Sequence, residues 1–233
     1  MLRHFRRHLG LLAGMLIAAL GIAYRYLFNT IEERTLSFYA RSALHATGMA
    51  LAEELGEVRV HDLITRFFFD IDAPIADHDG EVHAYVGDQV IVSWPLRAEA
   101  ARNARWLHCF FAAQDRIDAL APAYLREFGV VPRFRAGAHA GSVVVSECGD
   151  TRRQIAYFGD TMNVAARLCE QCKATGEALV ASAELLRNTA VPSAFTLGGR
   201  ATITLRGRQA PVEVHAIERG GMRPALLAAG AGA

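Results

Sequence analysis

The chain has almost no surplus of charge of either sign. Its 233 residues include 25 lysines and arginines and 24 aspartates and glutamates, a formal net charge of +1. Because binding to a nucleic-acid backbone needs a clear basic excess or stripe, this balance excludes nucleic acid as the expected partner. Lysine is nearly missing, since Lys173 is the only one. An apolar content of 52% is enough for one sizeable core, so we expect one globular domain with appendages.

Cysteine is also scarce, with four residues, of which only Cys169 and Cys172 have the spacing of a known motif, C-x-x-C. A zinc site would need two further ligands at a comparable spacing, and the sequence offers none. The pair also falls inside an expected helix and is followed by no thioredoxin-like pattern. We therefore interpret these cysteines as reduced, structural thiols rather than as a metal or redox site.

Long apolar runs are confined to the N-terminus. After a basic start, residues 9–24 are all apolar or small, and the run extends to Phe28 if Arg25 snorkels. A membrane-spanning helix needs about 20 such residues, and no clear small-x-small cleavage site precedes Arg25. We predict an uncleaved membrane anchor within residues 1–30. The alternative is the last helix of a longer membrane domain, and arginines on both sides leave its orientation open.

The remaining pattern alternates short strands with helices. The Gly87-Asp88 pair between two β-rich runs predicts a tight hairpin. In the first half we expect a strand over 35–44, helices around a break at Gly56 that end or bend at Pro74, and the hairpin at Gly87-Asp88. A long helix over 98–128, with Pro122 as a candidate kink, and a hairpin around Ala140-Gly141 follow. The last part is expected to form a strand over 154–159, a helix from Thr161 to about Lys173 with Asp160 as its N-cap, a strand and short helix over 178–186, and a closing hairpin over 201–217. Residues 220–233, rich in Gly and Ala, are expected to be disordered. This order predicts an α+β fold in which helices pack on one face of an antiparallel sheet.

Three ordered motifs carry a family resemblance: YVGDQVIVSW, then FRAGAHAGSVVVSECGDTRRQIAYFGDTMNVAARL, and finally LRGRQAPVEVHAI. Together they resemble the catalytic domain of class III adenylate and guanylate cyclases, over roughly Thr35 to Ile217. The resemblance implies a cyclase domain over residues 31–219 with a ferredoxin-like antiparallel sheet. It also implies a head-to-tail dimer, either a homodimer or a heterodimer with another cyclase chain, with the active sites in the interface.

The resemblance assigns roles to five residues. Asp88 matches a metal-binding aspartate that holds Mg²⁺ or Mn²⁺ against the nucleotide phosphates, and Asn163 and Arg167 match the catalytic pair that orients the ribose and stabilises charge on the α-phosphate. Gly87, beside Asp88, and Arg206, where the family has a basic residue for the terminal phosphates, are assigned to substrate binding. Independently, an amide and a guanidinium at i and i+4 of one helix can reach a single ligand.

Each assignment has a purely structural alternative. Asp88 alone is compatible with simple turn chemistry, Asn163 with capping at a helix start, and Arg167 with a solvated helix surface. Arg206 is equally compatible with a charge at a strand end.

The sequence also departs from the family pattern. The position of the other metal aspartate, counted back from Ala-Glu-x-Leu-Gly, is Leu44, and no aspartate precedes Asp62. The two adenine-reading positions are Ala84 and Ala156. Their neighbours His83 and Gln154 are candidates to contact a base instead.

The leading hypothesis is a membrane-anchored cyclase that converts ATP, or GTP, to the cyclic 3′,5′ monophosphate and pyrophosphate as a dimer. It would lie at the inner membrane with its catalytic domain in the cytosol. The alternative, motivated by Leu44, is a weakened homologue that binds nucleotide or regulates another cyclase chain. A third hypothesis, a polymerase-palm relative such as a diguanylate cyclase, fits the Gly-Asp hairpin but not the helix of Asn163 and Arg167.

Overall fold

The structure is a computed structural model that describes residues 31–42, 56–148, 154–204 and 211–220. The chain forms two compact units. The larger contains residues 34–141 together with the chain from residue 160 onward, and the smaller contains residues 142–159 together with the chain before residue 34. The predicted anchor in residues 1–30 and most of the predicted tail lie outside the described residues. In the part of the chain that the structure describes, no helix has the length and apolar character needed to cross a bilayer.

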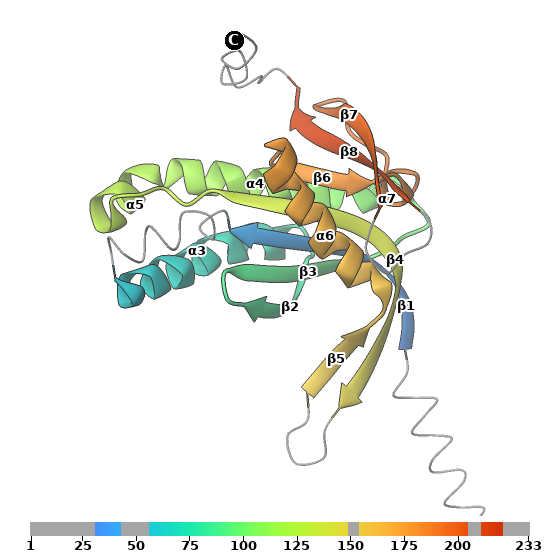
Figure 1. Ribbon diagram of the computed structural model, residues 1–233, viewed down its shortest axis with the longest axis horizontal. Helices are drawn as coiled ribbons and strands as arrows, with labels where there is room; N and C mark the ends of the chain where they lie inside the picture. The colour runs from blue at the N-terminus through green and yellow to red at the C-terminus, as the bar shows by residue number, and fades with distance from the viewer. Residues whose placement is uncertain (1–30, 43–55, 149–153, 205–210, 221–233) are drawn as a thin grey trace, which may run out of the picture. The chain divides into compact units, whose positions relative to one another are not determined.

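Seven strands follow one another across the sheet in the order β2-β3-β1-β4-β6-β8-β7 (Figure 1). The pair β4 and β6 is parallel, with Ala136 opposite Leu179, whereas β1–β3, β2–β3, β6–β8 and β7–β8 are antiparallel. A parallel pair requires a long crossover, and helix α6 supplies it. The strands are β1 (Ile31–Ser42), β2 (Glu81–Val86), β3 (Gln89–Pro95), β4 (Phe134–Cys148), β6 (Leu179–Ser182), β7 (Phe195–Ile203) and β8 (Val212–Arg219).

The hairpin predicted around Ala140-Gly141 is wrong, because β4 runs without interruption through both residues. In the smaller unit, the end of β4 pairs instead with the antiparallel strand β5 (Gln154–Phe158), with Val144 opposite Phe158. Position 141 requires a glycine for a reason other than a turn. A Cβ atom there would lie 2.5 Å from the Thr161 side chain, so the glycine allows close packing of a helix rather than a turn.

The helices follow the predicted pattern with two differences. They are α3 (Glu57–Asp77), the 3₁₀ turn η1 (Arg102–Ala104), α4 (Arg105–Ala119), α5 (Ala121–Phe128), α6 (Asp160–Thr175) and α7 (Ala183–Leu186). The predicted long helix is broken at Leu120, and Pro122 occupies the first turn of α5, where a missing N–H costs little. Helix α3 does not end at Pro74 but continues to Asp77. Pro74 is buried in the last turn, so only one helical hydrogen bond is lost.

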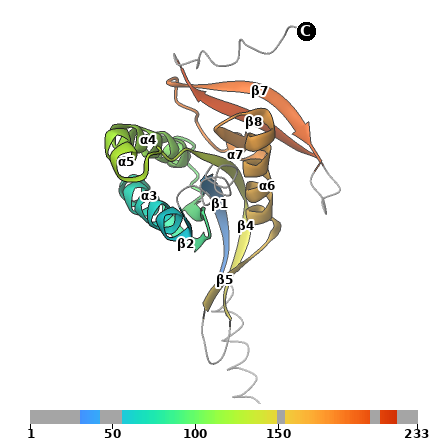
Figure 2. The same cartoon turned by 60° about the vertical axis from the view of Figure 1, so that its left-hand side comes forward.

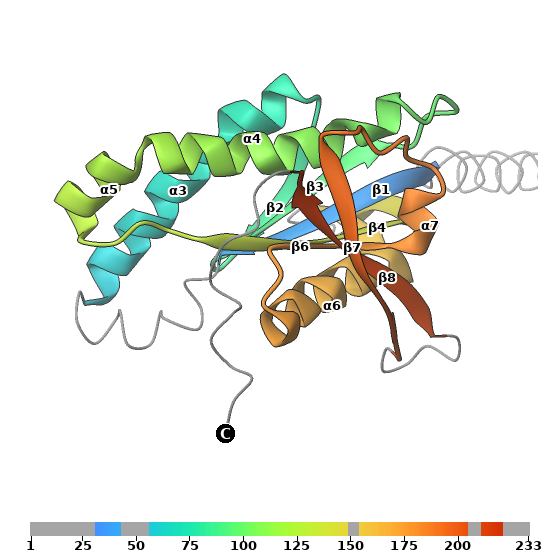
Figure 3. The ribbon, with the colours of Figure 1, turned by 90° about the horizontal axis from the view of Figure 1, so that it is seen from above.

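The helices cover both faces of the sheet, which corrects the prediction of helices on one face. Leu179 and Ala181 of β6 belong to the main core cluster together with buried residues of α3 and α4. Val180, between them, packs in a second cluster with Val164 and Leu168 of α6. Because successive side chains of a strand point to opposite faces, α6 lies across the sheet from α3 and α4. Figures 2 and 3 show this arrangement directly; we name the two sides the α3/α4 face and the α6 face.

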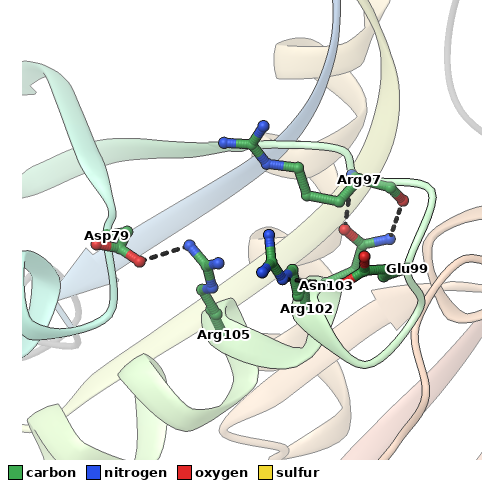
Figure 4. Close-up of polar contacts among 6 residues, drawn as sticks. All are labelled: Asp79, Arg97, Glu99, Arg102, Asn103 and Arg105. Carbon is green, nitrogen blue, oxygen red and sulfur yellow. Dashed lines mark hydrogen bonds and ion pairs between the residues drawn. The ribbon is translucent and has the colours of Figure 1, made fainter.

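A buried asparagine fixes the connection between β3 and α4 (Figure 4). The Asn103 side chain accepts a hydrogen bond from the Arg97 backbone N–H at 2.8 Å and donates to the Arg97 carbonyl at 2.8 Å. It also donates to the carbonyl of Asn188, after α7, at 2.7 Å. Nearby, Arg105 pairs with Asp79. This clamp holds the start of α4 against the chain that follows α7.

Candidate functional site

Gly87 and Asp88 form the turn of the predicted β2–β3 hairpin, with Val86 opposite Gln89. Gly87 has a φ of 62°, and Asp79 is the only described non-glycine residue with positive φ. A positive φ at the first central residue alone is the pattern of a type II′ turn, which suits the twist of a hairpin. The half-buried Asp88 therefore stands at the tip of the hairpin, at the β2 edge of the sheet.

Helix α6 carries an apolar stripe and, next to it, Asn163 and Arg167. Val164, Leu168 and Cys172, spaced four residues apart, are buried against the sheet. Asn163 is exposed and Arg167 is half-buried, so the predicted pair borders the stripe at the solvent side of the helix. The helix begins at Asp160 itself rather than at Thr161, which places an acidic residue in the first turn, where the helix dipole favours it.

Two glycines of β4 bring α6 unusually close to the sheet. A Cβ atom on Gly137 would lie 2.2 Å from the Ala165 carbonyl oxygen and 2.3 Å from the Cys169 nitrogen. One on Gly141 would lie 2.5 Å from the Thr161 hydroxyl oxygen. The height of the Asn163 turn above the sheet is thus set by backbone contact with β4.

Within one copy, Asp88 and the Asn163–Arg167 pair lie on elements that are several strands apart. Asp88 joins β2 to β3, whereas α6 packs on β6 and β8. The same helix also lies against Gly137 and Gly141 of β4, and strand β1 separates β3 from β4. At a strand spacing of roughly 4.8 Å, β3 is therefore about 10 Å from β4 and about 14 Å from β6. The carboxylate of one copy is therefore badly placed to share a metal-bound phosphate with the pair of the same copy.

The described residues offer few metal ligands. No group of three or more His, Cys, Asp or Glu side chains among them is arranged to hold a metal ion. Asp88 is a single oxygen donor, which suits a hard divalent cation that takes its remaining ligands from phosphate and water. Leu44 and Arg206, the positions of the missing aspartate and of the predicted phosphate ligand, lie outside the described residues.

The C-x-x-C cysteines are structural, as predicted. The Cys172 thiol donates to the Ala136 carbonyl at 3.2 Å, and the Cys169 thiol to the Arg135 carbonyl at 3.5 Å. Burial, with a smaller contribution from Cys169, raises the pKa of Cys172. Buried thiols that donate to backbone carbonyls are poor metal ligands and poor nucleophiles.

The positions predicted to contact the base include a β-bulge that the sequence did not indicate. In β2, Val82 pairs with Val92 and Ala84 with Ile91, so His83 is the extra residue. The His83 imidazole is hydrogen-bonded to the hydroxyl of Ser93. Since the neighbours of Ser93 in β3 belong to the main core, Ser93 and His83 face the α6 side of the sheet. Ala156 and Gln154, the other two positions, lie in β5.

A buried histidine network went unrecognised in the sequence. His139 of β4 is 3% exposed, and its Nδ1 lies 2.8 Å from the hydroxyl of Ser182. Its Nε2 lies 3.3 Å from a carboxylate oxygen of Glu184. The sequence signal was the spacing Gly137-x-His139-x-Gly141, which places one large side chain between two glycines on the same face of a strand.

Known proteins of one family match most of the chain. The family described as "Adenylate and Guanylate cyclase catalytic domain" matches residues 44–219. Among characterised relatives, adenylate cyclase 2 of Rhizobium meliloti is 33% identical over 168 residues, covering 72% of this chain and 45% of that protein. Adenylate cyclase 1 of the same organism is 29% identical over 159 residues, covering 66% and 23%. The chain thus spans less than half the length of these relatives.

Solved structures share the fold. The guanylyl cyclase Cya2 aligns with a TM-score of 0.69 at 16% identity, covering 81% of this chain and 93% of that chain. The adenylyl cyclase CyaB from P. aeruginosa aligns with a TM-score of 0.68 at 20% identity, covering 81% and 95%. At these identities the likeness establishes the architecture.

Proposed function

Because the chain belongs to the adenylate and guanylate cyclase catalytic domain family, we propose that it converts a purine nucleoside triphosphate, ATP in the first instance, to the cyclic 3′,5′ monophosphate and pyrophosphate. The observation that carries the proposal is the amide-guanidinium pair at Asn163 and Arg167, held one turn apart on α6 by an apolar stripe that faces the sheet. The relatives named adenylate cyclase favour ATP over GTP.

The reaction is an attack of the ribose 3′ oxygen on the α-phosphate, with pyrophosphate as the leaving group. Negative charge grows on the phosphoryl oxygens, and donors fixed in advance stabilise it most strongly. In this proposal the Arg167 guanidinium donates two parallel hydrogen bonds to those oxygens. Asn163, one turn earlier, holds the ribose so that the 3′ oxygen stays in line with the phosphorus. The N-terminal end of α6, nearby, also favours the anionic substrate.

We assign a divalent cation, Mg²⁺ or Mn²⁺, to Asp88. A hairpin tip with one half-buried carboxylate fits a cation that keeps water and phosphate oxygens as its other ligands. Such a cation would neutralise phosphate charge. Gly87 and Arg206 stay assigned to substrate binding, Gly87 because it lets the backbone of the turn approach the phosphates closely.

The proposed enzyme is a dimer. In one copy, β3, which follows the Asp88 turn, lies about 10 Å across the sheet from β4 and about 14 Å from β6, the strands that α6 covers. A twofold axis that faces the Asp88 hairpin of one copy with α6 of its mate would bring both sets of groups to one nucleotide and create two equivalent sites. A heterodimer with another cyclase chain would satisfy the same geometry.

Formation of cyclic AMP and cyclic GMP by the purified chain, with Mg²⁺ and separately with Mn²⁺, tests the proposal. We expect cyclic AMP from the wild type and at least a 100-fold loss in Asn163→Ala. Arg133→Ala, which removes an exposed arginine paired with Asp118, is the matched control and should keep full activity. Activity that survives in Asn163→Ala would refute the assignment of the pair.

Leu44 is the observation that favours the second candidate, a weakened homologue that binds nucleotide or regulates another cyclase chain. Loss of a metal ligand removes several kcal/mol of transition-state stabilisation, roughly three orders of magnitude in rate. The two candidates separate in one experiment. A wild type that is silent and is activated by Leu44→Asp supports the weakened homologue, whereas an active wild type supports the enzyme.

We also propose that residues 1–30 anchor the chain in the inner membrane with its catalytic domain in the cytosol, where the triphosphate is. The apolar run over residues 9–24 supports the anchor. Fractionation of cells that express the chain should place it in the membrane pellet, resistant to carbonate washing. Removal of residues 1–30 should release it.

A further inference from the structure

The His139 network satisfies the imidazole at both nitrogens. In one neutral arrangement, the Ser182 hydroxyl donates to Nδ1 and the Nε2–H group donates to Glu184. The Ser182 oxygen also accepts the Leu185 backbone N–H at 3.2 Å and so caps α7. The ring is therefore held between β6 and α7 and has no freedom to rotate.

The order Ser182, His139 and Glu184 resembles a nucleophile with its base and its orienting acid. That interpretation fails on burial, because Ser182 is 0% exposed and its oxygen already caps a helix. No substrate can reach the hydroxyl. The network must act through what the imidazole supports, not through bond-making at Ser182.

His139 comes from the part of β4 on which the helix with Asn163 and Arg167 packs. Gly137, His139 and Gly141 alternate along β4 on the α6 face, while Ala136, Ala138 and Ala140 face the main core. Gly137 lies against Ala165 and Cys169, and Gly141 against Thr161. His139, midway between the glycines, therefore lies under the first two turns of α6, which include Asn163.

His139 is thus the large side chain that lies between the two glycines on this face of β4. The flanking glycines set how closely the helix approaches the strand, but they offer no side chain that resists a shift of the helix along it. A ring fixed at both nitrogens does resist it. We propose that His139 is a positioning residue for the cyclisation reaction, which holds the first two turns of α6 at the place along β4 where Asn163 and Arg167 meet the nucleotide.

The proposal rests on the proposed function for its catalytic readout, so its test has a second readout that needs no activity. In His139→Ala, kcat should fall about 100-fold, because a misplacement of about 1 Å costs that much. KM should change by less than about threefold, since the lost interaction is realised mainly in the transition state. Amide hydrogen exchange should accelerate by at least about tenfold in residues 160–167 and less elsewhere in α6.

Val214→Ala is the matched control. Val214 is buried in the same cluster as the α6 stripe but comes from β8. We expect it to lower the melting temperature while keeping kcat within about threefold and leaving exchange in residues 160–167 unchanged. His139→Gln, whose amide can still reach Glu184 and fill most of the space, should regain part of both readouts and replaces His139→Ala if that variant does not fold.

Two results would overturn the proposal. One is normal kcat and normal exchange of residues 160–167 in the His139 variants. The other is an activity loss that merely follows melting temperature, equal in His139→Ala and Val214→Ala. If the wild type makes no cyclic nucleotide, the proposed function fails, and hydrogen exchange alone still decides whether His139 supports the Asn163 turn.

Discussion

Arg167 offers the sharpest test at the scale of a residue, because its role depends on the shape of its side chain and not only on charge. Lysine keeps the positive charge but cannot donate two parallel hydrogen bonds to a phosphoryl group. We expect Arg167→Ala to lower kcat by roughly 10²–10³-fold and Arg167→Lys to regain at most about a tenth of the wild-type rate. Steady-state kinetics of cyclic AMP formation measure both. Full activity in Arg167→Lys would show that the guanidinium fork is not used.

Cys109 predicts how stability depends on pH. It is 2% exposed in the main core, and burial raises the pKa of its thiol to about 12. Because the folded pKa lies above the unfolded value near 9, this contribution to stability is complete below pH 9 and declines as the pH rises toward 12. Between pH 8 and pH 10.5 the free energy of unfolding should fall by about 2 kcal/mol from this group alone.

Urea unfolding at the two pH values checks that expectation. Cys109→Ala is less stable than the wild type at pH 8, since it loses buried sulfur contacts. Its further decrease at pH 10.5 should be smaller by about 2 kcal/mol. An equal decrease in both proteins would mean that Cys109 ionises in the folded chain as readily as in the unfolded one. Tyr124 and Cys172, whose pKa values burial also raises, contribute in the same direction and are unchanged in the comparison.

At the scale of an element, the contact between β4 and α6 decides where Asn163 and Arg167 lie. Gly137→Ala would place a methyl group 2.2 Å from a backbone oxygen of α6. This oxygen cannot move away unless the helix moves with it. We expect a loss of about 3 kcal/mol or more in the free energy of unfolding, together with reduced activity, because the whole helix must shift. Chemical denaturation of the purified variant measures the first effect.

Gly199→Ala in β7 is the control for that substitution. A Cβ atom at Gly199 meets nothing within 4 Å, and the residue has no positive φ. Its stability should therefore equal or slightly exceed that of the wild type. Similar losses in the two variants would show that the cost at Gly137 is a general property of glycine in strands and not of helix packing.

The elements also show what the sequence could and could not predict. Gly87-Asp88 could be predicted as a turn because a tight hairpin needs a positive φ at that point, which glycine adopts readily, and this requirement is local. Gly141 was misread as a turn because glycine equally serves close packing, and the helix that approaches it is 20 residues further along the chain. The choice between the two depends on tertiary contact, which a local pattern does not contain.

The site was predictable in its parts and not in its arrangement. Asn163 and Arg167 could be placed on one helix and Asp88 in one turn, because the spacing within each segment is local. Strand order was not predictable, so neither was the separation of about 14 Å between β3 and β6. The same holds for the opposite faces of α3 and α6 and for the role of His139, which becomes visible only when Gly137 and Gly141 are seen against α6.

At the scale of the whole molecule, the proposed activity requires two copies that complete each other's sites. The family match covers residues 44–219, and the cyclase architecture is shared with solved relatives. Within one copy, Asp88 and the Asn163–Arg167 pair lie on elements that at least one intervening strand of the sheet separates. A variant that lacks Asp88 and a variant that lacks Arg167 are then each inactive alone but carry complementary defects.

Mixing those two variants is the most direct measurement. After subunit exchange between Asp88→Ala and Arg167→Ala, about half of the dimers contain one copy of each, and each mixed dimer has one site in which both groups are intact. The mixture should form cyclic AMP at about a quarter of the wild-type rate, although each variant alone is inactive. Mixed dimers that form, as shown by differently tagged copies purified together, and yet remain inactive would contradict the shared site.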